Sequence, residues 1–168
     1  NSGGGSSGNK GGSGGGKKKF SKEYKFAPFG STKSNFATFE QTREKFIQDC
    51  AISVKKSKQV CQALDSLTPV DWNAKKPTME VPEVAADQPG YAAQLRACEI
   101  EYEKLLKEWY QSKNDYEDAL DVVYNKCMRD YCTQGMVNKL KEQPDFESTV
   151  KGDPIELLKR CRDLLQNT

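Results

Sequence analysis

Residues 91–132 read YAAQLRACEIEYEKLLKEWYQSKNDYEDALDVVYNKCMRDYC, and the apolar pattern of this stretch decides the fold class. Large apolar and aromatic side chains recur at alternating steps of four and three residues, which is close to a repeat of about 3.5 residues. The spacing predicts a long coiled-coil-like helix over residues 91–134 with one packing stripe, here called the seam. We expect these seam residues to mediate helix packing or assembly: Leu95, Tyr102, Leu105, Trp109, Tyr116 and Val123.

An unbroken helix of this length would extend about 60 Å, roughly twice the width of a small domain. It must therefore pair lengthwise with another helix, protrude or break. Residues 111–115 are the candidate break, because Asn114 and Glu117 have the spacing of a new helix start. The seam stays in phase across this point, which favours a continuous helix.

An aromatic lead-in and a first long helix are predicted over residues 26–67. Thr38 and Gln41 have the spacing of a capping box, and Pro69 marks the end of the helix. Its apolar stripe includes Phe39, Phe46, Cys50, Val54 and Leu64.

The connection over residues 68–90 holds four of the seven prolines, so we expect a loop there. A loop of this length allows the second long helix to return antiparallel to the first. We therefore predict an all-α fold built on a long antiparallel helical hairpin that buries Trp109.

Short helices are predicted over residues 135–168. Asp153 stands at the N-cap position of the last one and Pro154 at its first helical position. The apolar face of this helix has no evident partner, and the first residue of the chain is not methionine. We therefore expect a fragment whose last helices continue into a further domain.

Residues 1–25 are predicted to form a disordered basic arm, since most of the first sixteen are glycine or serine. Six lysines against one glutamate give the arm a charge of +5, while twenty basic and twenty-three acidic residues leave the body at −3. Such an arm suits a polyanion, either nucleic acid or a phospholipid surface. The residues expected to bind RNA are Lys17, Lys18, Lys19, Phe20, Lys22 and Lys25.

The composition of the 168-residue chain argues against an enzyme. It has no histidine, which removes the commonest general base and all imidazole-dependent triads and zinc sites. Hydrophobic residues make up 36% and no stretch approaches the length of a membrane helix. We expect no catalytic residues, no cofactor, no metal and no small-molecule substrate.

The six cysteines have no C-x-x-C spacing, and most lie on apolar helical stripes. No apolar stretch ahead of Cys50 in this sequence resembles a secretory signal. We therefore expect reduced, buried thiols in a cytoplasmic setting.

Several short runs follow one another in a recognisable order: KKKF at 17–20, FAPFG at 26–30, EYEK at 101–104, YNKCMR at 124–129 and GDPIELLK at 152–159. In order and spacing they resemble the Gag-like polyproteins of LTR retrotransposons from single-celled eukaryotes. The resemblance implies a structural protein, a capsid-region segment that self-associates into homo-oligomeric particles and packages RNA. The zinc knuckle that often lies downstream in that family is absent from this sequence.

A second interpretation is a cytoplasmic coiled-coil adaptor. Its seam would bind the helix of another protein, and the lysines of residues 17–25 would contact anionic lipid or direct nuclear import.

Overall fold

The computed structural model describes residues 24–30 and 38–166, and the prediction of an all-α fold is confirmed for them. The predicted disordered arm, apart from Tyr24 and Lys25, lies outside the described residues. The elements are α1 (Phe39–Ser53), α2 (Lys58–Ser66), α3 (Tyr91–Lys126), the π-helical turn η2 (Cys127–Tyr131), α4 (Gln134–Lys141), the π-helical turn η3 (Phe146–Val150) and α5 (Pro154–Leu165).

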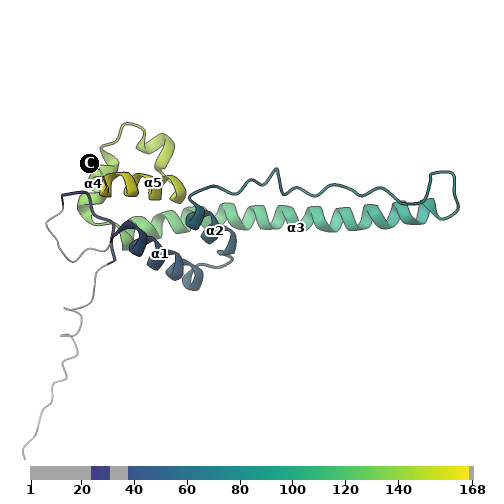
Figure 1. Ribbon diagram of the computed structural model, residues 1–168, viewed down its shortest axis with the longest axis horizontal. Helices are drawn as coiled ribbons and strands as arrows, with labels where there is room; N and C mark the ends of the chain where they lie inside the picture. Colours follow the sequence, from purple (N-terminus) through teal and green to yellow (C-terminus); the bar gives the residue numbers. More distant parts are fainter. Residues whose placement is uncertain (1–23, 31–37, 167–168) are drawn as a thin grey trace, which may run out of the picture.

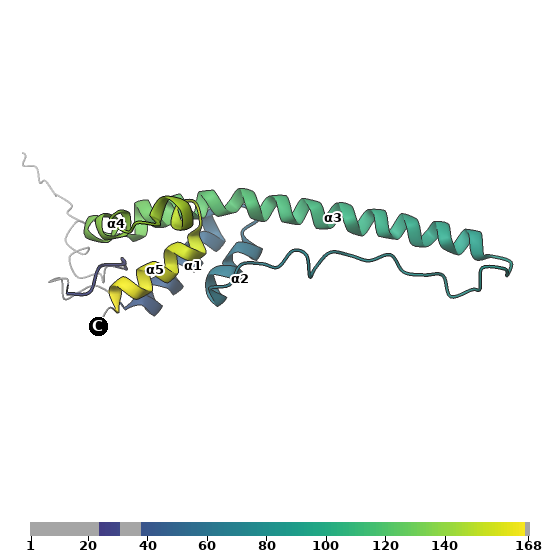
Figure 2. The same ribbon diagram turned by 90° about the horizontal axis from the view of Figure 1, so that it is seen from above.

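The molecule consists of a helical head and a projecting rod (Figures 1 and 2). In the head, the elements α1, α2, α4, η3 and α5 pack together with the C-terminal part of α3. The rod is the N-terminal half of α3, residues 91–108, with the chain of residues 73–90 running back beside it. With its 36 residues, α3 is about 54 Å long. The helix was expected to pair lengthwise with another helix, to protrude or to break, and in the structure it protrudes.

The helix α3 does not break at residues 111–115. It is continuous from Tyr91 to Lys126, and the side chain of Gln111 donates a hydrogen bond of 2.9 Å to Asp115 across this point. Its end differs from the expected residue 134, because the η2 turn closes it at Tyr131. Thr133 then caps α4 by accepting a hydrogen bond from the Met136 amide.

The predicted first long helix is two helices in the structure. Thr38 and Gln41 do form the capping box, but the chain turns at residues 54–57, where Val54 is extended and Lys56 has a φ of 52°. The helix α2 then packs back on α1, so that Arg43 donates to the Asp65 carbonyl oxygen at 3.0 Å. The expected long partner for α3 is therefore absent from the described part of the chain.

The segment that returns along α3 is the proline-rich chain of residues 68–90, here called the return segment. It is not helical, as predicted, because its prolines remove amide donors. The antiparallel return expected of a hairpin is thus made by an extended chain beside a helix (Figure 1).

The core of the head draws on segments from both ends of the chain. Phe26 is fully buried, 5.5 Å from the ring of Phe39, and its amide donates to the Tyr131 carbonyl oxygen at 2.7 Å. The amide of Phe29 donates to the carbonyl oxygen of Leu164 at 2.7 Å. Residues 24–30 thereby join the start of α1 to the ends of η2 and α5.

The apolar face of α5 is not open, contrary to expectation. Asp153 caps the helix through the amides of Ile155 and Glu156, as predicted. The face behind this cap packs on α1, α2, α3 and α4, and Leu157, Leu158 and Cys161 are fully buried. The sequence pattern showed the face but not the elements that cover it.

Replacing Trp109 by alanine should lower the free energy of unfolding by about 3 kcal/mol, because a large buried side chain is lost. Trp109 is 9% exposed and its neighbour Tyr110 is 49% exposed. Tyr110→Ala is therefore the matched control and should cost under about 1 kcal/mol. Urea denaturation of both variants measures the difference, and equal losses would contradict this register of α3.

Candidate assembly surfaces and the cysteine cluster

The predicted seam divides into a buried and a partly covered half. Val123, Tyr116 and Trp109 are buried, with exposed fractions of 0, 5 and 9%. Towards the tip, Leu95 and Tyr102 are half-buried and Leu105 is 39% exposed. The seam thus packs mainly within its own chain.

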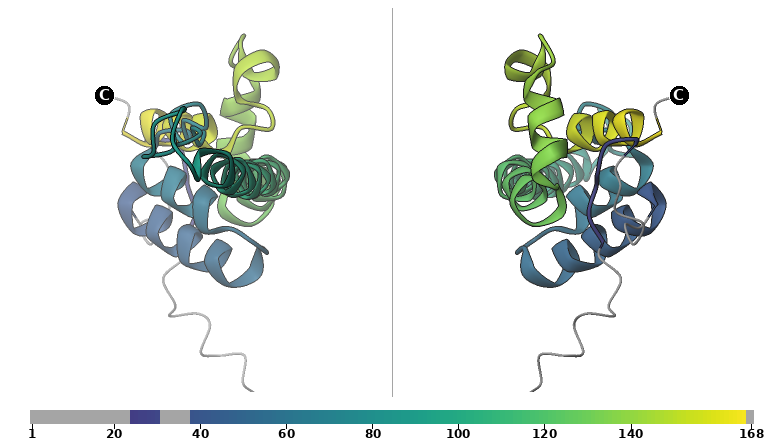
Figure 3. Two further views of the ribbon diagram at one scale, coloured as in Figure 1. Left: turned by 90° about the vertical axis from the view of Figure 1, so that its right-hand side faces the viewer. Right: turned by 90° about the vertical axis from the view of Figure 1, so that its left-hand side faces the viewer.

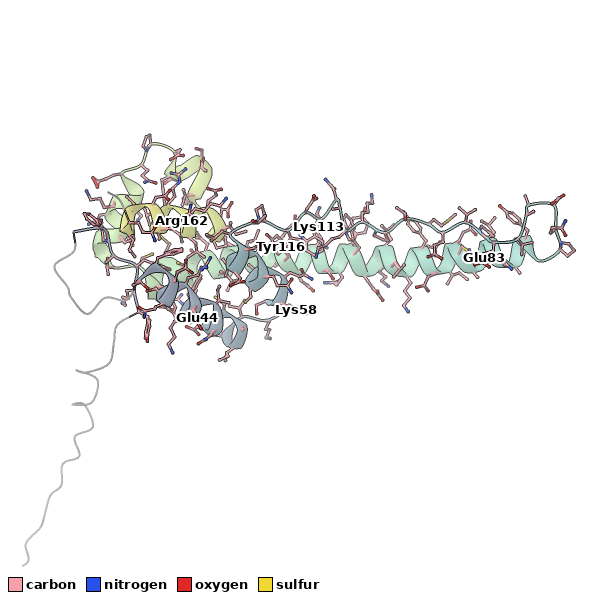
Figure 4. The ribbon with its side chains drawn as sticks, in the orientation of Figure 1. Glu44, Lys58, Glu83, Lys113, Tyr116 and Arg162 are labelled. Carbon is pink, nitrogen blue, oxygen red and sulfur yellow. The ribbon has the colours of Figure 1, made fainter. Side chains whose placement is uncertain are left out.

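The return segment is hydrogen-bonded to seam residues at the junction between the head and the rod. The indole Nε1 of Trp109 donates to the Trp72 carbonyl oxygen at 2.9 Å, and the Trp72 ring lies 5.6 Å from that of Tyr116. Burial raises the pKa of Tyr116, so its hydroxyl stays protonated and accepts a hydrogen bond from the Val70 amide at 3.3 Å. Figure 4 labels Tyr116 at this junction and Glu83 farther out on the return segment.

Of the predicted RNA-binding residues, the structure describes one. Lys25 is half-buried beside the fully buried Phe26. The other five, Lys17, Lys18, Lys19, Phe20 and Lys22, lie outside the described residues. The structure therefore places the end of the predicted binding segment on the head, away from the rod tip (Figure 1).

A carboxylate on α1 joins that helix to the end of α3. The hydroxyl of Tyr131 donates to Asp49 Oδ2 at 2.7 Å, and the Lys126 ammonium lies 3.3 Å from the same oxygen. The Tyr131 hydrogen bond, followed by the Lys126 interactions, holds the pKa of Asp49 below its usual value, although desolvation opposes the shift. Sequence periodicity could not find this contact because its partners are 82 residues apart.

We expect Asp49→Asn to destabilise the protein at neutral pH and to matter less in acid. A carboxyl whose pKa is lowered on folding stabilises the fold above its unfolded pKa, near 4, and loses that contribution as pH falls through the folded pKa. The difference in free energy of unfolding between wild type and variant, from urea melts at several pH values, should shrink below about pH 4. A difference that stays constant with pH would contradict the assignment.

Three buried cysteines lie close together in the head. Cys127, Cys132 and Cys161 are all nearly inaccessible, and the sulfurs of Cys132 and Cys161 are 4.0 Å apart. All six cysteines are free thiols in the structure. Within the described ranges, no three cysteine or acidic side chains are placed to hold a metal ion. Burial raises the pKa of Cys127 and also that of Cys50, to about 12, so these thiols are poor nucleophiles.

Thiol labelling should therefore divide the cysteines into two classes. Under native conditions a maleimide should reach the half-buried Cys61 and Cys98 and spare the four buried residues. After denaturation without reductant, intact mass should show six adducts. Fewer than six would reveal a disulfide and contradict the predicted reduced state.

The periodicity did not predict a surface groove that lies between the α1–α2 turn and residues 115–122 of α3. It has a volume of about 450 Å³. Val54, Ala119 and Val122 form its apolar part, and Lys55 and Lys56 line one side. The signal available in the sequence was Val122, an apolar residue out of phase with the seam.

Comparison with protein-family models, curated proteins and solved structures gave no match. Across the described part of the chain, no helix is both long enough and apolar enough to cross a membrane.

Proposed function

We propose that the protein is a structural, Gag-like protein of a retrotransposon that assembles with copies of itself and contacts RNA through its basic arm. The observation that supports this proposal is the rod. The rod, the N-terminal half of α3, lies beyond the core of the head, and its exposed apolar side chains include Ile100 and Leu105. Apolar side chains that a helix exposes outside the core of its own chain can pack against another molecule.

The arrangement of the two predicted contact regions supports a role in assembly. Residues 24–30 are anchored in the head by Phe26, and Lys25 of the predicted RNA-binding set is half-buried there. An RNA contact at Lys25 would therefore lie on the head, while the rod tip points away from it (Figure 2). A subunit with these two ends can hold nucleic acid and neighbouring subunits at the same time.

The alternative is a coiled-coil adaptor that binds the helix of a different protein. The exposed face of the rod fits this role as well, because a helix can pair with any complementary helix. An adaptor would stay monomeric by itself, whereas a Gag-like protein would form larger species.

We expect the mass of the full chain to rise with concentration and to rise further when single-stranded RNA is added. Multi-angle light scattering measures the mass, and fluorescence anisotropy measures RNA affinity. Deleting residues 1–25 should abolish most RNA affinity, and the affinity of the full chain should fall steeply with salt. A chain that stays monomeric with and without RNA would overturn the proposed function in favour of the adaptor.

A further inference from the structure

The side of α3 opposite the seam presents a second stripe, here called the outer stripe. Its members follow one another at steps of four, three, four, four, three and four residues, which keeps them on one helical face. Figure 3 shows α3 end-on, with the head helices covering only part of its circumference. The outer stripe consists of Ile100, Lys104, Lys107, Gln111, Asp115, Asp118 and Val122.

The outer stripe is self-complementary about Gln111. The apolar side chains Ile100 and Val122 stand eleven residues before and after Gln111, and they are 52 and 54% exposed. Lys104 and Asp118 stand seven residues before and after it, so residues of opposite charge occupy matching positions.

The inner pair of the outer stripe follows the same symmetry. Lys107 and Asp115 stand four residues on either side of Gln111. Asp115 has a weak ion pair with Lys56 at 3.6 Å, whereas Lys104, Lys107 and Asp118 form no ion pair with another described residue. Three of the four charges are therefore available to a partner.

We propose that the partner of the outer stripe is a second copy of this chain, packed antiparallel across a twofold axis at Gln111. In this arrangement Lys104 and Lys107 of each copy face Asp118 and Asp115 of the other copy. The proposal rests on the proposed self-association and names the surface and geometry that would produce it.

The groove beside the outer stripe gives this dimer an apolar contact at each end. Antiparallel pairing brings Ile100 of one copy to the level of Val122 of the other, where Val54 and Ala119 complete the apolar part of the groove. Because the interface is isologous, the contact forms twice. A parallel pair would instead place lysine against lysine and aspartate against aspartate, which is repulsive.

Charge reversal at one residue of each pair tests the register. K104D brings two aspartates together in each half of the dimer, and D118K brings two lysines together, so either should raise the dimer dissociation constant by about tenfold or more. An equimolar mixture of K104D and D118K should dimerise again, because every facing pair in the mixed dimer then has opposite charges. The double variant K104D/D118K should also dimerise.

Rescue by the double variant cannot arise within one chain. Residues 104 and 118 are about 21 Å apart along the helix, beyond the screening length at physiological salt. Lys139→Asp, an exposed site on α4 with the same change in charge, is the matched control and should leave the dimer unchanged. Sedimentation equilibrium measures the dissociation constants, and circular dichroism checks that each variant is folded.

The outcomes separate this interface from self-association in general. Single reversals that weaken the dimer, with recovery in the mixture and the double variant, support the proposal. Wild-type association that neither reversal changes, or a loss that neither combination restores, overturns the interface and leaves the proposed self-assembly standing. A wild-type chain that is monomeric at all concentrations, with and without RNA, overturns both.

Discussion

The contact between Trp109 and Trp72 determines where the rod begins. The indole of Trp109 donates a hydrogen bond of 2.9 Å to the return segment at the edge of the core, and Tyr116 packs on Trp72 and accepts a hydrogen bond from Val70. On the head side of this contact, α3 is covered by helices. On the tip side, an extended chain alone lies along it. The division of the molecule into a head that folds around its own core and a rod that projects beyond it follows from this contact.

Local periodicity predicted the buried residues better than it predicted their partners. Phe46, Cys50 and Leu64 are fully buried as expected. The same apolar spacing, however, fits one straight helix through residues 54–57 and also two helices that fold back on each other there. Ile47 and Cys61 illustrate this ambiguity, since they are 14 residues apart in the sequence and yet meet through a contact of Cys61 Sγ with the Ile47 carbonyl oxygen. A helical pattern identifies a face; the element that covers it is a tertiary property.

The candidate surfaces show the same limit. The seam was recognised from its spacing, and its register is consistent with the burial of Trp109 beside an exposed Tyr110. Its C-terminal half is buried within the chain, as the hairpin prediction expected for Trp109. The group that bonds Trp109 could not be predicted, because a backbone carbonyl such as that of Trp72 has no signature in a side-chain pattern. Apolar periodicity does not predict the outer stripe, because lysine, glutamine and aspartate occupy its middle positions. Its symmetry can be recognised only once α3 is known to be continuous and to expose Ile100 and Val122 at the two ends of the stripe.

The contact between residues 29 and 164 has a topological consequence. The Phe29 amide bonds the Leu164 carbonyl oxygen, so the two ends of the folded body meet in space, while the return segment joins α2 to α3 only by way of the distant tip. Packing of the core therefore does not depend on the order in which the helices follow one another along the chain. A circular permutant opened at the tip and joined across residues 24 and 166 preserves every helix-to-helix contact in the head. It also converts the rod into a free helical terminus.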